Sequence, residues 1–171
     1  MRRTLVALLS LLPLAFAARP AAALPVVYSV SMTGAQEIGG GDPDGTASGT
    51  ISIDSTSGLI SWSFTFQNIA APTAMHIHGP NGPAGTNANI FVGLGVNTSG
   101  GAGTLIDSLT TDPANAAAIN ANPTDFYVNI HNGDFPNGAI RGQLGTVLPE
   151  PGVAHLLAAA LGLAALRRRA R

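Results

Sequence analysis

Three histidines in the middle of the chain have the type and spacing of a metal site. His76 and His78 are two residues apart in a segment expected to be a strand, so both imidazoles point to one face of the sheet. His131 ends another expected strand. If these strand ends are neighbours, the three imidazoles can bind one copper or zinc ion in a trigonal or tetrahedral site with an open position. Glu37 and Asp134 are the carboxylates that could complete it.

The same histidines have a structural alternative. His78 is followed directly by a Gly79-Pro80 turn, and imidazoles beside such turns often hydrogen-bond the turn's backbone and fix its shape. A His-x-His pair is by itself a weak indication of metal binding. The sequence therefore leaves two expectations open, either no cofactor or a bound copper or zinc ion.

Charge narrows the range of partners. Residues 24–150 contain all nine acidic residues of the chain and a single basic one, Arg141, which gives this stretch a net charge of about −8. Because such a domain repels phosphate backbones, we expect no nucleic-acid partner. Arg141 is expected to pair with Glu37 or Asp134 and lock the last strand in place, and the functional alternative is a site for an anion or an acidic sugar.

No constellation of nucleophilic catalysis is present. The sequence has no nucleophile elbow, no phosphate-binding Gly-rich motif ending in lysine and no cysteine. We therefore predict no catalytic residues and a protein that is not an enzyme. The absence of cysteine also excludes disulfides, so packing alone must stabilise the domain.

The elements that must position these side chains are short strands. Between residues 59 and 67 the apolar residues Ile60, Trp62, Phe64 and Phe66 alternate with polar ones, which is the period of a half-buried antiparallel strand. We interpret this aromatic stripe as a core face rather than a ligand platform, so Trp62 is expected to be buried.

The rest of the middle has the same character. Further strands are expected at 26–32, 47–53, 74–78, 88–94, 104–108, 126–131 and 139–144, separated by turn-forming residues. One helix is expected, with Asp112 as its cap, Pro113 at its first position and Asn122-Pro123 at its end. About eight short strands and one short helix indicate an all-β fold, an antiparallel Greek-key-like β-sandwich or barrel.

The N-terminus has the features of a secretory signal peptide. A basic start is followed by an apolar run at 5–18 and by three alanines that end at Ala23. The run is too short for an ordinary spanning helix, which needs about 20 residues. We expect cleavage after Ala23, the alternative being an uncleaved anchor.

The C-terminus has a similar design. Its features are a Pro-Glu-Pro motif, an apolar stretch at 152–166 and an arginine cluster: Pro149, Glu150, Pro151, Arg167, Arg168 and Arg169. Arginines after an apolar segment are typical of the cytoplasmic end of a transmembrane helix. Roughly 22 Å of helix against a hydrocarbon core of about 30 Å favours transient membrane contact over a permanent anchor.

Several motifs taken together resemble the CHRD domain, the module named after chordin. They are Gly34–Glu37, Thr73–Pro80, Tyr127–His131 and Asn137–Leu144. The resemblance covers about residues 26–145 and implies an extracellular β-domain with little chemistry of its own. To the motif and core residues we assign chiefly structural roles: Glu37, Trp62, Gly79, Pro80, Asn129, Arg141, Gly142 and Gln143.

The C-terminal segment resembles the PEP-CTERM sorting signal. That resemblance implies recognition by an exosortase in the inner membrane, cleavage near the motif and delivery to the outer surface, in a setting of exopolysaccharide and biofilm. The expected organisation is a signal peptide at 1–23, a CHRD-like β-domain at 24–148 and a sorting tail at 149–171.

The sequence thus supports two functional hypotheses. The first is an exported, non-enzymatic protein of the cell surface or extracellular matrix, with signal peptidase and exosortase as partners during export and exopolysaccharide or matrix proteins as partners afterwards. The second is an extracellular copper- or zinc-binding domain, with redox activity left open, that uses His76, His78 and His131.

Overall fold

The structure, a computed structural model, describes residues 24–96 and 103–148. Within these residues nine strands pair into one antiparallel sheet in the order β5-β4-β7-β8-β1-β2-β3-β6, with β9 beside β1. The strands are β1 (Val26–Thr33), β2 (Thr46–Ile53), β3 (Leu59–Gln67), β4 (Pro72–His78), β5 (Ile90–Leu94), β6 (Thr104–Thr110), β7 (Tyr127–Asn132), β8 (Ile140–Gln143) and β9 (Thr146–Val147). The predicted all-β class is confirmed, and each predicted strand lies within a few residues of its expected place.

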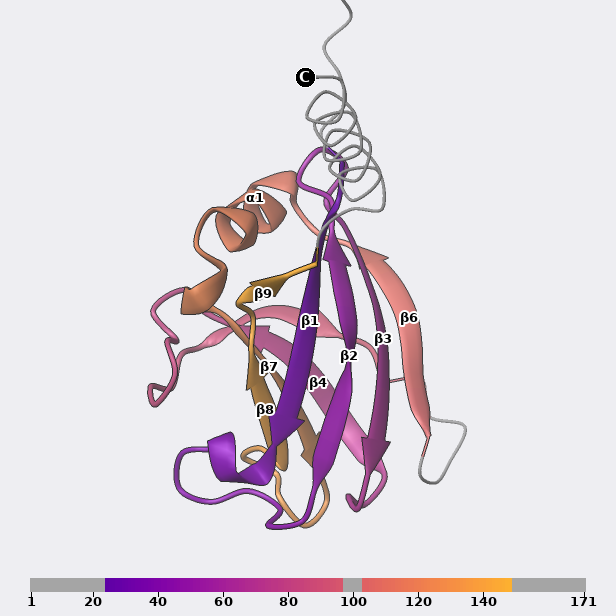
Figure 1. Cartoon of the computed structure of the whole chain (residues 1–171), viewed down its shortest axis with the longest axis vertical. Coiled ribbons are helices and arrows are strands. Elements are labelled where there is room, and N and C mark those ends of the chain that lie inside the picture. The colour runs from indigo at the N-terminus through magenta and orange to yellow at the C-terminus, as the bar shows by residue number, and fades with distance from the viewer. Residues whose placement is uncertain (1–23, 97–102, 149–171) are drawn as a thin grey trace, which may run out of the picture.

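The sheet folds over on itself into two layers. Strands β1, β2, β3 and β6 form one layer, and β4, β7 and β8 cross behind it (Figure 1). The layers are joined through β8 and β1, where Thr33 lies opposite Arg141 in the register. Because β4 follows β3 in sequence but pairs with β7 and β5, the chain crosses between layers instead of forming a simple meander.

The core lies between the layers and is formed by alternate residues of each strand. In β3, Ile60, Trp62, Phe64 and Phe66 all face inward, and Trp62 is 4% exposed. In the opposite layer Met75 and Ile77 of β4 are fully buried. The period of two therefore identified the inner face correctly, because successive strand residues point to opposite sides of a sheet.

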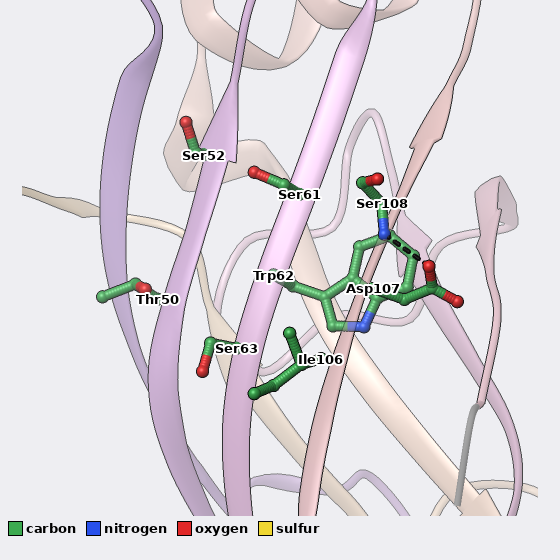
Figure 2. Close-up of a pocket in the computed structure, with 8 residues that line it drawn as sticks. All are labelled: Thr50, Ser52, Ser61, Trp62, Ser63, Ile106, Asp107 and Ser108. Carbon is green, nitrogen blue, oxygen red and sulfur yellow. Dashed lines mark hydrogen bonds between the residues drawn. The ribbon is translucent and has the colours of Figure 1, made fainter.

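The outer face of the β1-β2-β3-β6 layer is covered with short hydroxyl side chains. In register, Ser31 lies opposite Ser48, and Ser48 lies opposite Thr65. A hollow of about 440 Å³ on this face is lined by residues of β2, β3 and β6 (Figure 2). Asp107 lines it, and no histidine does, so the three candidate histidine ligands lie elsewhere.

One α-helix, α1 (Pro113–Ala121), links β6 to β7 and lies at one end of the two layers (Figure 1). As predicted, the Asp112 side chain caps it by accepting a hydrogen bond from the Ala114 backbone N–H at 2.8 Å, and Pro113 is its first residue. Ala116 and Ile119 bury its inner side in the core. Short 3-10 turns at Gly34–Gln36 (η1) and Pro123–Asp125 (η2) complete the described elements.

The expected signal peptide and sorting tail, at 1–23 and 149–171, lie outside the described residues. Among the residues that are described, no helix has the length and apolar character that crossing a bilayer requires.

Candidate metal centre

The outer face of β4, β7 and β8 carries the polar residues that the sequence singled out. Inner residues of these strands belong to the core, and every second residue points the other way. The register places these outward residues in two rows across the three strands, His76–Asn129–Arg141 and His78–Tyr127–Gln143. Residues from distant parts of the chain are thus brought together by antiparallel pairing.

The structure brings the three histidines together. One ring nitrogen from each of His76, His78 and His131 lies within 4.8 Å of those of the other two. The closest pair is His76 Nδ1 and His131 Nε2, at 3.1 Å. In a tetrahedral site with metal–nitrogen bonds of 2.0–2.1 Å, two ligand nitrogens lie about 3.3 Å apart. A separation of 4.8 Å would therefore have to shorten by about 1.5 Å for all three nitrogens to bind one ion.

Backbone carbonyls determine which ring nitrogen of His78 and of His131 is free to bind a metal. His78 Nδ1 lies 2.9 Å from the Ala88 carbonyl oxygen, and His131 Nδ1 lies 2.9 Å from the Pro136 carbonyl oxygen. Because a carbonyl only accepts, each Nδ1 must carry the proton, and in the neutral ring Nε2 keeps its lone pair. A metal-ligating histidine almost always donates its other ring N–H in this way.

The carbonyl contacts follow from local sequence. The Asn132 side chain accepts hydrogen bonds from the backbone N–H groups of Asp134 and Phe135, at 3.0 and 2.7 Å, and shapes the turn that carries Pro136. Glycine is needed at Gly79, directly after His78, since its φ is +150° and a Cβ there would lie 2.1 Å from the Phe126 ring. The structural role expected for histidines beside a turn is therefore present together with the clustering.

Burial sets the protonation of the site. It lowers the pKa of His76 to about 4, with the neighbouring His131 and His78 acting in the same direction. Burial also lowers the pKa of His78; the hydrogen bond to the Ala88 carbonyl opposes this effect, and the neighbouring His131 and Arg141 add to it. Both rings are therefore neutral near pH 7, the form that can bind a metal.

One nitrogen in the cluster has no partner. His78 Nε2 is buried and makes no hydrogen bond in the described structure. The face of the His78 ring is covered by Tyr127, whose ring stacks on it with centroids 4.8 Å apart and planes 4° from parallel. A buried acceptor without a donor costs stability unless something binds it.

The expected carboxylate ligands do not join the cluster. Among the described residues, the group of candidate metal ligands consists of the three histidines, without Glu37 or Asp134. The Glu37 side chain instead accepts a hydrogen bond from Asn129 Nδ2 at 2.5 Å. Burial raises the pKa of the Glu37 carboxyl to about 7, although the positive charge of Arg141 lowers it.

Arg141 differs from its expected role. It is 1% exposed, and its guanidinium donates to Asn87 Oδ1 at 3.2 Å and to the Thr86 carbonyl at 2.9 Å. Its Cζ lies 3.6 Å from the centre of the Tyr127 ring. In the described part of the chain it forms no ion pair with Glu37 or Asp134, because the β4–β5 connection folds over β7 and β8 and supplies neutral acceptors first. The prediction of a carboxylate partner is wrong, while the expected locking role fits the contacts.

Gln143 and Gly142, two further motif residues, help to hold the β4–β5 connection and strand β8 in place. Gln143 Nε2 donates to the carbonyls of Gly82 and Thr124, at 2.6 and 2.8 Å. Gly142 lies so close to β1 that a Cβ would be 2.4 Å from the Ser31 carbonyl oxygen. Pro80, by contrast, is exposed at the start of the β4–β5 connection. Sequence reasoning missed Asn87 and Ala88, because neither belongs to a recognisable motif.

The sequence pattern of the CHRD domain family matches residues 28–144. No curated protein and no solved structure matches the chain significantly. The matched stretch contains all three histidines, Glu37 and Arg141.

Proposed function

The chain belongs to the CHRD domain family, and from this membership we propose that it is an exported protein of the cell surface or extracellular matrix. From the clustering of His76, His78 and His131 we propose that its β-domain binds one copper or zinc ion. Membership of this family is typical of extracellular and secreted proteins. The proposed role is metal binding within a matrix or surface protein, without an assigned catalytic residue.

The observation that carries the metal proposal is the unpaired His78 Nε2. It is buried beside two other imidazoles, and the proton of its ring is already donated to the Ala88 carbonyl. A metal ion would satisfy this lone pair, together with those of His131 and His76. His76 would then carry its proton on Nε2 and offer Nδ1, the atom that now faces His131.

The ligand set indicates the class of metal. Three imidazoles suit copper and zinc, whereas calcium and magnesium prefer sets of oxygen ligands. Three ligands leave an open position for water or a small ligand. Copper bound there would bring redox chemistry, and zinc would not. Among the described residues no carboxylate belongs to the group of candidate ligands, and the positive charge of Arg141 lowers the pKa of His78. The three imidazoles would therefore bind the ion without a negatively charged ligand.

Three observations support the proposed export. The first 23 residues have the basic, apolar and small-residue regions of a signal peptide, and the tail has a Pro-Glu-Pro motif, an apolar stretch and an arginine cluster. The acidic, cysteine-free middle suits a soluble domain stabilised by packing. In this proposal signal peptidase cuts after Ala23, an exosortase processes the tail near Pro149, and the released domain stays in exopolysaccharide or among matrix proteins.

Metal analysis of the exported protein, purified without an affinity tag, tests the binding proposal. One equivalent of copper or zinc should remain after gel filtration or be taken up on titration. At a free metal concentration a hundred times the dissociation constant, the native state should gain about 2.7 kcal/mol. A melting curve that neither metal shifts, together with no bound metal, would overturn the proposal and leave the histidines a structural role.

Mass spectrometry of the two mature ends tests the export proposal separately. We expect a start at Leu24 and an end near Pro149 in the extracellular fraction. Deleting the exosortase gene of the host should leave the tail uncut and the protein at the membrane. An intact chain found in the cytosol would contradict export without bearing on metal binding.

A further inference from the structure

A second feature lies beside the histidines on the outer face of β4 and β7. It is a cavity of about 380 Å³, which we name the amide cavity. Its polar lining comes from five parts of the chain: Glu37, His78, Asn87, Tyr127, Asn129 and Asn137. Among these residues the metal proposal makes use only of His78.

The strongest indication of a ligand is Asn129. This residue is 2% exposed, and its Nδ2 donates to Glu37 while its Oδ1 is buried without a hydrogen-bond partner in the described structure. Reversing the amide would only transfer the deficit, since the amide nitrogen would then be the unpaired atom. A buried acceptor in a cavity wall is satisfied by a donor that enters the cavity.

The orientation of a second amide is fixed from outside the cavity. Asn87 Oδ1 accepts from the Arg141 guanidinium, so the Asn87 amide nitrogen points the other way and keeps its two donor hydrogens. Asn137 adds another amide at the exposed rim. The cavity lining therefore offers both an unpaired acceptor and amide donors, which matches hydroxyl groups, because each hydroxyl both donates and accepts.

Charge decides against an anion. Arg141 is buried, its guanidinium is bound to Asn87 and Thr86, and the Tyr127 ring covers it, so it cannot reach a ligand. The carboxyl that lines the cavity belongs to Glu37. Burial raises its pKa to about 7, so near pH 7 it is partly ionised, and the ionised form would repel an acidic ligand. Phosphates and acidic sugars are therefore disfavoured as ligands. This disfavours the site for an anion or an acidic sugar that was the functional alternative for Arg141.

We propose that the amide cavity binds a neutral, hydroxyl-rich ligand, a single saccharide unit, with Asn129 Oδ1 and the Asn87 amide as its principal contacts. The volume lies at the lower end of the range for small-molecule sites, which leaves room for one such unit. The inference deepens the matrix role proposed above but does not depend on the metal, because it rests on the amides and not on the imidazoles. The unit could be a free sugar or one residue of a polysaccharide.

Isothermal titration of the exported protein tests this inference. The probes are glucose, galactose, mannose and N-acetylglucosamine, a neutral tetrasaccharide of the best of these, and glucuronate. We expect saturable binding of at least one neutral sugar with a dissociation constant on the order of 1 mM or below, and glucuronate binding at least about tenfold more weakly. A tetrasaccharide that binds more tightly than its monomer indicates a polysaccharide as the source, and equal affinities indicate a free sugar.

Variants locate the binding. Asn129→Leu should abolish sugar binding while leaving metal uptake unchanged, and Asn137→Ala, at the exposed rim, should weaken it about fivefold or more without lowering the melting temperature. Asn89→Ala, an exposed asparagine outside the cavity, is the matched control and should bind as the native protein does. Asn137→Ala keeps the test valid if Asn129→Leu does not fold.

The inference is overturned if no neutral sugar saturates, if glucuronate binds more tightly than the neutral sugars, or if both cavity variants bind normally. Metal uptake measured on the same samples separates this failure from failure of the metal proposal, since either result can occur without the other.

Discussion

The Nδ1 atom of His76 lies 3.1 Å from the Nε2 atom of His131, although 55 residues separate the two histidines in sequence. The contact exists because β4 and β7 pair antiparallel, with Ala74 opposite His131 and His76 opposite Asn129. This diagonal relationship across neighbouring strands turns a His-x-His pair into a group of three, and the metal proposal rests on it.

Removing one imidazole should abolish tight metal binding. His131→Ala should weaken zinc and copper binding by more than about a hundredfold, because loss of even a residue behind a ligand commonly costs 10–100-fold. Competition with a chromogenic chelator measures this affinity. Asp134→Asn is the matched control: the residue is exposed and outside the histidine group, so its variant should differ by no more than about twofold. Equal affinities of the two variants would contradict the assignment.

Replacing Glu37 should change how stability depends on pH. Burial raises the pKa of its carboxyl from 4.5 to about 7, so the folded state retains a proton that the unfolded chain loses. This stabilisation is complete below pH 4.5 and is lost as the pH rises through 7. Glu37→Gln lacks this titration, so the stability of the variant relative to the native protein should rise between pH 4 and 8, by on the order of 1 kcal/mol after solvent screening.

Urea unfolding of both proteins in the presence of a chelator checks this prediction. His76, whose pKa is lowered to about 4, acts in the opposite direction, since its contribution is lost as the pH falls from 6.5 towards 4. Both proteins contain His76, so its effect cancels in the difference. A difference that does not vary with pH would show that Glu37 is ionised normally.

Replacing Arg141 with lysine should lower the stability of the domain. Arg141→Lys removes the planar group that bonds Asn87 and Thr86 together and covers the Tyr127 ring. A compact ammonium cannot make the same contacts, and it would remain buried and poorly paired. We expect a loss of about 2–4 kcal/mol in the free energy of unfolding, measured with urea. A loss under about 0.5 kcal/mol would mean that the β4–β5 connection does not depend on this residue.

Truncating Trp62 should destabilise the core. The side chain is 4% exposed between the two layers, so Trp62→Ala leaves a cavity and should cost about 3–5 kcal/mol. Thermal melting measures the effect. Thr65→Ala, on the exposed side of the same strand, is the control and should stay within about 0.5 kcal/mol of the native protein. Similar melting of both variants would refute the assignment of the inner face.

The sequence by itself indicated which residues of β3 face inward and, to within a few residues, where most of the elements lie. Alternation in 59–67 predicted the buried side of β3, and Asp112-Pro113 predicted the start of α1, because both signals are local: a strand repeats every two residues, and a cap acts within one turn. Motif order also indicated the family that the comparison then gave.

The tertiary structure determined which residues these side chains contact. Nothing local to His131 indicates that β7 pairs with β4, and nothing local to Arg141 indicates that its acceptors are Asn87 and Thr86 instead of a carboxylate. Strand order and the path of the β4–β5 connection depend on how the whole core packs, which is a sum over contacts between residues far apart in sequence. For this reason the sequence could name the candidate ligands, whereas only the folded sheet placed the histidines in one group and left Glu37 outside that group.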